Sequence, residues 1–294
     1  MRTITAREHE LINSVLGEGL TALAAAVLEK DLLVTEVLRT VVAVNSGGIQ
    51  LVFCGGTCLS KAHGLIERMS EDIDFKLVLP QGVSRSARSR VLSRYKRRLV
   101  EVLESAGFVV PADQIIACDE NSYVSLNLHY ESRFAPVASL RPEIKLELSA
   151  RAPVLPTVRL PIASMLDVLI GAPKTDLQVE CIGVEETLAE KILSFLRRTA
   201  GAWAGRNRAD YDDRLVRHLY DVRAIAQGCD GLALPYEHFA TMVAGDAAQF
   251  RNQYPEFEDD PVGQMRLALD ALHHEADAFE TTFASSMSWS LESP

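Results

Sequence analysis

Two aspartates, Asp72 and Asp74, are separated by a single residue in a segment where polar and apolar residues alternate. Alternate residues of a β-strand share a face, so both carboxylates are predicted to point the same way, while Ile73, Phe75 and Leu77 point into the core. Two carboxylates on one exposed face repel each other unless a cation lies between them. Hard oxygen ligands of this kind suit Mg²⁺ or Mn²⁺, which bind a few carboxylates together with phosphate oxygens and water.

A third carboxylate is available in the segment 143–148, where Ile144, Leu146 and Leu148 are predicted to face inward. Glu147 then lies on the opposite face, where a neighbouring strand can bring it to the aspartate pair. Three carboxylates on adjacent strands make a two-metal site. One metal activates an attacking hydroxyl group, and both stabilise the charge on a phosphate and its leaving group.

A glycine pair precedes the aspartates, at the end of the short apolar run 49–53. Gly55 and Gly56 let backbone N–H groups approach a phosphate closely, and a helix predicted to begin at Thr57 adds the positive end of its dipole. The turn is not a P-loop, because no Gly-Lys-Ser/Thr sequence closes it. Further candidate phosphate contacts are two hydroxyl groups and two cations, from Thr57, Ser60, Lys61 and Arg68.

Each of these features is common by itself. An Asp-x-Asp pair on a strand more often belongs to a solvated face, and a glycine pair before a helix is mostly turn chemistry. The combination is far more specific: a strand, a Gly-Gly-Thr turn, a helix and then a second strand that carries both aspartates. This order favours a site that binds phosphate and metal together.

Apolar periodicity predicts the elements that must position these residues. Helices are expected where apolar residues recur at three- or four-residue spacing, and strands where short apolar or alternating runs end at glycine or proline. Strands are predicted at 49–53, 73–79, 123–130 and 143–148. Helices are predicted at 5–43, 57–66, 84–106, 185–199, 212–227, 236–247 and 261–283. The order is mixed α/β first and mainly helical second, which predicts two domains, 1–183 with an N-terminal helical segment and 184–294.

Charge is distributed unevenly along the chain. The formal net charge of −10 argues against indiscriminate binding of nucleic acid. Residues 85–98, however, contain seven arginines and lysines and no acid, and a second basic stretch lies within 197–217, whereas 256–292 is largely acidic. A polyanion such as RNA could dock on the basic helix, although that helix could equally be a solvated face.

Neither membrane insertion nor export is predicted. No apolar run approaches the ~20 residues needed to cross a bilayer. The polar and charged residues that follow Met1 do not form a signal peptide. The five cysteines are odd in number and widely scattered, which favours reduced thiols. A cytoplasmic location is therefore expected.

The motifs resemble those of the AbiEii/AbiGii nucleotidyltransferase toxins, the toxin components of type IV toxin–antitoxin and phage-abortive-infection systems. The first part of the resemblance is G-G-T-x-L-S-K at 55–61 followed by R-x-S-x-D-I-D at 68–74. The sequence E-E-T-L-A-E-K at 185–191 resembles the helix that carries the family's functional lysine. The sequence R-H-L-Y-D at 217–221 resembles the family's R-H-x-Y-D motif.

The resemblance implies an α+β chain with a DNA-polymerase-β-like nucleotidyltransferase domain, built on a small mixed sheet, and a mainly helical domain after it. It implies transfer of a nucleotide from an NTP to an acceptor, in some members a tRNA 3′ end, with release of pyrophosphate. It also implies a cognate antitoxin. Asp72 and Asp74 would bind Mg²⁺ or Mn²⁺, and Lys191 and Asp221 would complete the catalytic set.

The nucleotide would then be bound by residues of the first motif: Gly55, Gly56, Thr57, Ser60, Lys61, Arg68 and Ser70. Glu147 as a third metal ligand is inferred from the strand pattern, because the family's third carboxylate is variable. An RNA acceptor, such as tRNA, is expected from the family and from the basic stretches together.

Other interpretations of the same residues stay open. Lys191 could be one more charged residue on a solvated helix face, and Asp221 could be a buried partner of Arg217, four residues earlier. The acceptor could be a protein or a small molecule. The chain could also be a catalytically inert binding module on the same fold, although the intact motif residues argue against such decay.

Overall fold

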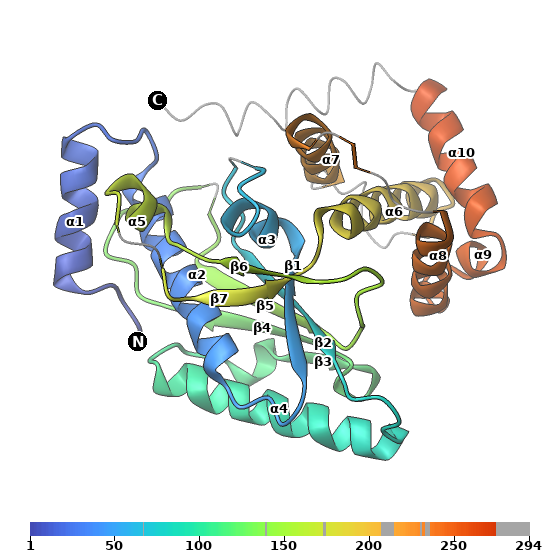
Figure 1. Cartoon of the computed structure of the whole chain (residues 1–294), viewed down its shortest axis with the longest axis horizontal. Coiled ribbons are helices and arrows are strands. Elements are labelled where there is room, and N and C mark those ends of the chain that lie inside the picture. Colours follow the sequence, from blue (N-terminus) through green and yellow to red (C-terminus); the bar gives the residue numbers. More distant parts are fainter. Residues whose placement is uncertain are drawn as a thin grey trace. The chain divides into compact units, whose positions relative to one another are not determined.

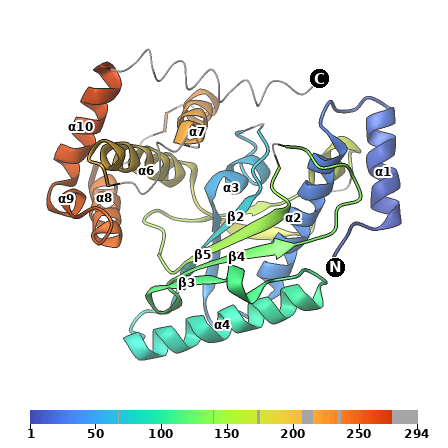
Figure 2. The same ribbon diagram turned by 180° about the vertical axis from the view of Figure 1, so that it is seen from behind.

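The structure is a computed structural model that describes residues 1–66, 68–138, 140–172, 175–206, 215–229, 231–232 and 236–274. The chain divides into two compact units, the first running from Met1 to Ile182 and the second beginning at Gly183. Figures 1 and 2 show the elements of both units from opposite sides. The sheet lies in the first unit, and the second unit is helical over its described residues.

Two helices, rather than the single predicted one, occupy the N-terminal segment 5–43. Helix α1 spans Ala6–Gly17 and α2 spans Ala25–Ala43. The Thr5 hydroxyl caps α1, and after α1 the chain turns through Gly19, whose φ of 68° is readily reached only by glycine. The prediction of one helix was wrong because apolar spacing is helical on both sides of this turn.

A seven-stranded mixed sheet forms the centre of the first unit, in the order β3-β4-β5-β2-β1-β7-β6. Its central strand β2 pairs antiparallel with β1 and parallel with β5. The bounds of the strands are Gln50–Cys54 (β1), Asp72–Val78 (β2), Ile116–Cys118 (β3), Tyr123–His129 (β4), Glu143–Ser149 (β5), Val158–Pro161 (β6) and Gln178–Cys181 (β7). The four predicted strands are confirmed within a residue or two, and they make up the middle of the sheet.

The three strands that the sequence did not predict, β3, β6 and β7, lie toward the edges of the sheet. They are three or four residues long, which is too short for an alternating pattern to stand out. Proline residues flank β6, so the local sequence there indicates a break more strongly than a strand.

Helices α2 and α4, the latter spanning Arg85–Ser105, lie along the sheet in both views (Figures 1 and 2). The apolar side of α4 consists of Leu92, Tyr95, Leu99 and Leu103, which join the same buried core as the strands. Two short helices complete the first unit, α3 at Gly55–Lys61 and α5 at Met165–Leu169. Helix α3 packs mainly against β2 and β1, directly beside the aspartates.

The second unit consists of helices over its described residues: α6 (Val184–Trp203), α7 (Val216–Gly228), α8 (Tyr236–Phe250), α9 (Pro255–Asp259) and α10 (Pro261–His274). The helices predicted at 185–199 and 236–247 are confirmed with slightly longer bounds. Residues 212–214 and 275–283 of the other two predicted helices lie outside the described residues. No helix in the described ranges is long and apolar enough to cross a membrane.

Three consecutive charged residues of α2 are buried, and each binds a different segment of the first unit. Glu29 accepts hydrogen bonds from the Ser132 hydroxyl and the Arg133 backbone N–H. Lys30 and Asp31 each form a buried ion pair, with Glu71 and Lys61 respectively. Burial of charge is costly unless each ion is paired and hydrogen-bonded. The charges of α2 therefore select one arrangement of the loops around the sheet.

Substitution of Asp31 by alanine is expected to destabilise the first unit by about 3–5 kcal/mol, because it leaves the Lys61 ammonium buried without its carboxylate. It also removes the acceptor of the Met165 backbone N–H. Urea unfolding followed by circular dichroism measures the loss. The control Arg39→Gln removes the exposed ion pair with Asp176 and should change the free energy of unfolding by only about 0–1 kcal/mol. Equal effects of the two substitutions would contradict the prediction.

Candidate active site

The parallel pairing of β2 with β5 brings two of the predicted metal ligands together. Asp74 stands directly opposite Glu147, and Asp72 stands opposite Lys145. As predicted, the side chains of Asp72, Asp74 and Glu147 share the partly exposed face, while the apolar residues between them are buried: Ile73, Phe75, Leu146 and Leu148. The strand pattern therefore placed the carboxylates on the correct faces.

Glu147 has two further partners on the same sheet. Its carboxylate accepts a hydrogen bond from the Tyr123 hydroxyl on β4 and lies 3.0 Å from the ammonium group of Lys145. Burial disfavours the charged form of Glu147, but the hydrogen bonds from Tyr123 and Lys145 outweigh it, so the pKa of Glu147 is lowered. A hydrogen bond with Asp74 also contributes to the lower pKa.

Asp72 has a partner that the sequence analysis missed. The guanidinium group of Arg141 lies 2.7 Å from the carboxylate of Asp72. Arg141 is in the segment that precedes β5, far from Asp72 in the sequence, and it belongs to no motif. Only the parallel pairing of β2 and β5 indicates that the two residues meet, because it places the start of β5 beside the start of β2.

The glycine turn approaches the aspartates very closely. Gly55 has a φ of 76°, and a Cβ atom at this position would lie 2.1 Å from Oδ2 of Asp74. A Cβ atom on Gly56 would lie 2.9 Å from the Ser70 hydroxyl and 3.1 Å from the guanidinium of Arg68. The two glycines therefore let the turn pass this close to Asp74, Ser70 and Arg68, where a side chain would not fit.

Thr57 does not cap a helix, contrary to the prediction. Helix α3 begins at Gly55, two residues earlier, and ends at Lys61 rather than at 66. The Thr57 side chain is buried, and its hydroxyl donates to the backbone carbonyl of Asp72 and lies 3.0 Å from the Ser70 hydroxyl. Thr57 therefore ties the glycine turn to the strand that carries the aspartates. The hydroxyl of Ser60 donates to the Thr57 carbonyl within the same helix.

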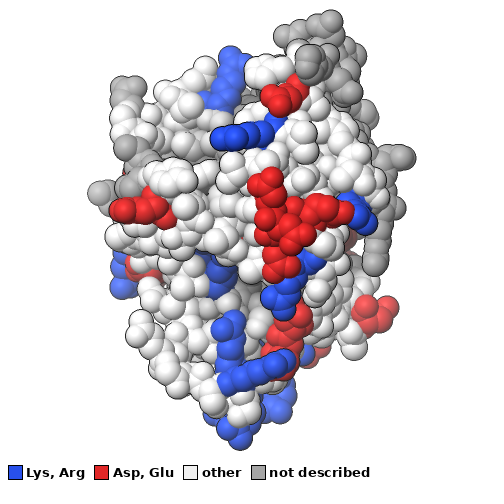
Figure 3. Space-filling view, turned by 90° about the vertical axis from the view of Figure 1, so that its right-hand side faces the viewer, with Lys and Arg blue, Asp and Glu red and all other residues white. Residues whose placement is uncertain are grey.

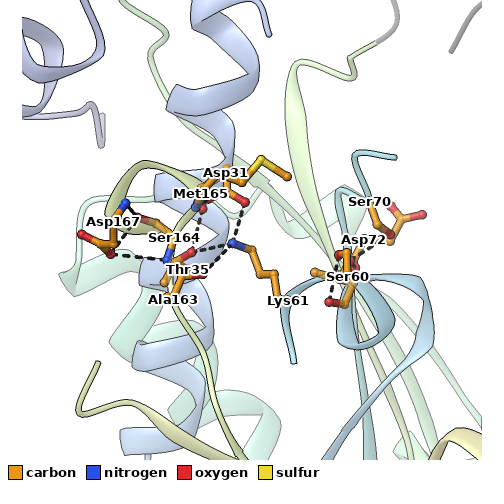
Figure 4. Close-up of polar contacts among 11 residues, drawn as sticks. Asp31, Thr35, Ser60, Lys61, Ser70, Asp72, Ala163, Ser164, Met165 and Asp167 are labelled. Atoms are coloured by element: carbon orange, nitrogen blue, oxygen red, sulfur yellow. Dashed lines mark hydrogen bonds and ion pairs between the residues drawn. The ribbon is translucent and has the colours of Figure 1, made fainter. Parts of the chain in front are cut away.

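Lys61 extends away from the aspartates (Figure 4). Its ammonium group lies 2.5 Å from the carboxylate of Asp31 and donates to the Thr35 hydroxyl at 2.9 Å, and its side chain is only 4% exposed. In Figure 4, Ser60, Ser70 and Asp72 form a separate group on the other side of α3. The structure therefore gives Lys61 a role in anchoring α3 to α2, whereas the sequence had placed it with the nucleotide-binding residues.

The two motif residues of the second unit contact each other. Lys191 on α6 lies 3.0 Å from the carboxylate of Asp221 on α7, and the Asp221 side chain is fully buried. Lys191 is 14% exposed, so it is not a solvated helix residue. The pairing acid comes from a neighbouring helix, which spacing along α6 alone could not reveal.

The carboxylates fit a hard divalent cation by their chemistry. Asp74 and Glu147 offer oxygen ligands from directly paired positions on adjacent strands. Mg²⁺ favours such sites, with few protein carboxylates and the remaining positions filled by phosphate and water. Within the described ranges, no three acidic, histidine or cysteine side chains are grouped closely enough to hold a metal as they stand. Arg141, rather than a third carboxylate, neutralises Asp72.

Paired carboxylates on neighbouring strands, beside a glycine turn, are the features of a nucleotidyltransferase. Comparison with known families agrees. The chain belongs to the family of the nucleotidyl transferase AbiEii toxin of type IV toxin–antitoxin systems, which it matches over residues 36–287. The resemblance inferred from the motifs is thus confirmed, and the chain is a nucleotidyltransferase toxin of this family.

One similar solved structure is the nucleotidyltransferase toxin MenT4 from Mycobacterium tuberculosis H37Rv. The match covers 94% of this chain and 98% of that chain, with 16% sequence identity and a TM-score of 0.41. At that TM-score the likeness adds nothing to the argument from the family. The search of curated proteins gave no match.

Substitution of Gly55 by alanine is expected to reduce nucleotide transfer by about 100-fold, because the new methyl group would displace the Asp74 carboxylate. The matched control is Gly64→Ala. Gly64 also has a positive φ, 64°, but no atom lies within 4 Å of an added Cβ. Both substitutions should cost about 1–2 kcal/mol of stability through backbone strain. If both variants lost the same transfer activity, displacement of Asp74 would not be the cause.

Proposed function

We propose that this toxin transfers a nucleotide from an NTP to a hydroxyl group of an RNA acceptor, such as a tRNA 3′ end. The acceptor oxygen forms a bond to the α-phosphorus, the bond from the α-phosphorus to the bridging oxygen breaks, and pyrophosphate leaves. The acceptor proton is released to the surroundings. The observation that carries the proposal is the adjacency of Asp74 and Glu147 beside the glycine turn at Gly55.

In this proposal Asp72, Asp74 and Glu147 hold Mg²⁺ or Mn²⁺, and the metal supplies Lewis-acid stabilisation of phosphate charge. The chain's own contribution is to orient these carboxylates. Tyr123 and Lys145 fix the carboxylate of Glu147 through two contacts on one oxygen. A carboxylate held in this way needs less reorganisation when substrate binds.

The phosphates of the NTP are proposed to lie over the turn of Gly55 and Gly56. The turn lies against the Asp74 carboxylate, the Ser70 hydroxyl and the Arg68 guanidinium, with no room for a side chain on either glycine. A guanidinium group donates well to phosphate oxygens. Thr57 and Ser60 would contribute through the backbone of α3, because their hydroxyls already bind carbonyl groups. Lys61 is left out of the proposed phosphate site because of its buried pair with Asp31.

The first unit is proposed to be the nucleotidyltransferase domain, and Lys191 and Asp221 of the second unit are proposed to take part in the reaction. What supports this role is the burial of the pair together with its position in two family motifs. A lysine held by a buried aspartate has a fixed direction. Such a cation suits the triphosphate or the leaving pyrophosphate.

An RNA acceptor is supported by the exposed side of α4. Arg90, Arg94, Arg97 and Arg98 are exposed and lie on the side of the helix opposite its buried residues. Figure 3 shows Lys and Arg side chains gathered along its lower part, toward the edge where Figure 1 places α4. Exposed arginines on one helix face can contact the phosphates of a polyanion and release its counterions.

Several other cations of the predicted basic surface already have partners within the protein. Arg85 pairs with Glu120, and the Arg88 guanidinium donates to the Ala150 carbonyl at 2.8 Å. In the second basic stretch, Arg197 pairs with Asp246 and Arg206 pairs with Glu256. Two more of its arginines, Arg208 and Arg214, lie outside the described residues. The exposed side of α4 is therefore the better candidate for docking RNA.

A cognate antitoxin is expected as a partner, because the family is one of type IV toxin–antitoxin systems. A protein or small-molecule acceptor is the alternative to RNA. A small molecule has no use for a row of four exposed arginines, so the surface of α4 favours the polymer.

The proposal is tested with purified protein, Mg²⁺, each labelled NTP in turn and total tRNA. The wild type should transfer label into RNA, and Asp74→Ala and Lys191→Met should each lower transfer by about 100-fold or more. The control is Arg197→Met, which removes an equally buried ion pair from the same helix α6. It should lower thermal stability while transfer at 25 °C persists.

The outcomes separate the alternatives. Label found on protein would identify a polypeptide acceptor. If Lys191→Met and Arg197→Met behaved alike, the Lys191–Asp221 pair would be structural. Neither transfer nor binding of any NTP would contradict the enzymatic function and favour a binding module.

The charge reversals Arg90→Glu, Arg94→Glu and Arg97→Glu together are expected to weaken tRNA binding about tenfold or more. They should also reduce its salt dependence, because fewer counterions are released. Filter binding at several salt concentrations measures both effects. The control protein carries Arg7→Glu, Arg159→Glu and Arg266→Glu, which change the net charge equally but lie exposed on α1, β6 and α10. Equal weakening in both proteins would mean that net charge, and not the α4 surface, controls binding.

A further inference from the structure

Arg141 is held beside Asp72 by its own backbone. The backbone N–H of Arg141 donates to the Glu71 carboxylate at 3.0 Å, and its carbonyl accepts from the Lys30 ammonium at 2.7 Å. Lys30 and Glu71 themselves form a buried ion pair, with side chains 0% and 9% exposed. Both polar groups of this one peptide segment are therefore fixed by buried charges.

This arrangement makes a chain of alternating charges that runs from the core to the site: Lys30, Glu71, Arg141 and Asp72. The buried members are costly to desolvate and so hold their geometry firmly. Glu71 also precedes Asp72 directly, so the same carboxylate that binds the Arg141 backbone fixes the start of β2. The guanidinium and its carboxylate are thus positioned from one shared anchor.

We propose that Arg141 is a positioning residue for Asp72. Its guanidinium orients the Asp72 carboxylate before the metal and nucleotide bind, and its positive charge sets how strongly the site attracts the metal. The inference rests on the proposed function, because it takes Asp72 as a metal ligand. Arg141 belongs to none of the motifs that identify the family.

The geometry gives Arg141 two opposing effects. It occupies Oδ1 of Asp72, an oxygen that a metal would use, and its charge repels a cation, so it weakens metal binding. It also restricts the rotation of the carboxylate, which favours correct alignment during transfer. Removal of the charge should therefore strengthen metal binding and impair catalysis at the same time. Loss of folding would impair both.

The first measurement is Mn²⁺ binding without nucleotide, by electron paramagnetic resonance. Arg141→Gln should lower the Kd for Mn²⁺ about three- to fivefold, the range expected for a partly exposed ion pair. Its kcat for nucleotide transfer should fall about tenfold, with little change in KM for the NTP. Arg141→Lys retains the charge and should keep the Kd near that of the wild type.

The control is Arg2→Gln. Arg2 pairs with Glu36 at 2.6 Å, and the two side chains are 22% and 30% exposed, close to the 25% and 33% of Arg141 and Asp72. This pair lies in the same unit but has no link to Asp72, so Arg2→Gln should change neither the Mn²⁺ Kd nor kcat. Thermal unfolding of every variant checks that it is folded.

Three results would overturn the inference. An unchanged or raised Mn²⁺ Kd in Arg141→Gln would show that the guanidinium does not compete with the metal. A raised KM for the NTP with an unchanged Mn²⁺ Kd would make Arg141 a phosphate contact instead. Asp72→Asn tests the proposed metal site itself. If this variant binds Mn²⁺ as the wild type does, Asp72 is not a metal ligand, and the proposed metal site is contradicted together with the role of Arg141. If only Asp72→Asn weakens binding, the metal site stands and Arg141 has no part in it.

Discussion

The buried charges of α2 are the constraint on which the rest of the first unit depends. Glu29 binds the turn at 132–133, Lys30 binds Glu71 and the carbonyl of Arg141, and Asp31 binds Lys61 and the backbone of Met165. A buried ion is stable only when its partner is present, so each of these segments has one permitted position. Apolar contacts stabilise the core of the sheet but would tolerate small shifts of its loops. Small shifts of these loops would break the buried ion pairs of α2.

The geometry of the site depends on these buried ion pairs. Glu71 fixes the start of β2, and Lys61 fixes the end of α3, so the glycine turn and the aspartates are held from both sides. Thr57 then joins the two through its bond to the carbonyl of Asp72. The close approach of Gly55 to Asp74 is the result, and it leaves no room for a side chain on Gly55. Precise alignment of charged groups is what transfer of a phosphoryl-linked group requires.

Prediction from the sequence succeeded where the information is local. Alternation along β2 and β5 determines which residues face the core, and that pattern assigned Asp72, Asp74 and Glu147 to one face. It failed where two local patterns look alike or are too short, as at the turn between α1 and α2 and in the strands β3, β6 and β7. Lys61 illustrates a different limit. A lysine next to a glycine turn suggests a phosphate contact, and nothing nearby in the sequence indicates that Asp31 neutralises it.

The sequence by itself therefore determined the family, the four central strands and the faces on which their carboxylates lie. Each is carried by residue type and spacing along the chain. Only the tertiary structure decided that Arg141 neutralises Asp72, that Asp221 neutralises Lys191 and that Arg88 of α4 binds a backbone carbonyl while Arg90, Arg94 and Arg97 stay exposed. The physical reason is that an ion pair depends on distance in space. Partners separated by many residues meet only when strands pair and helices pack.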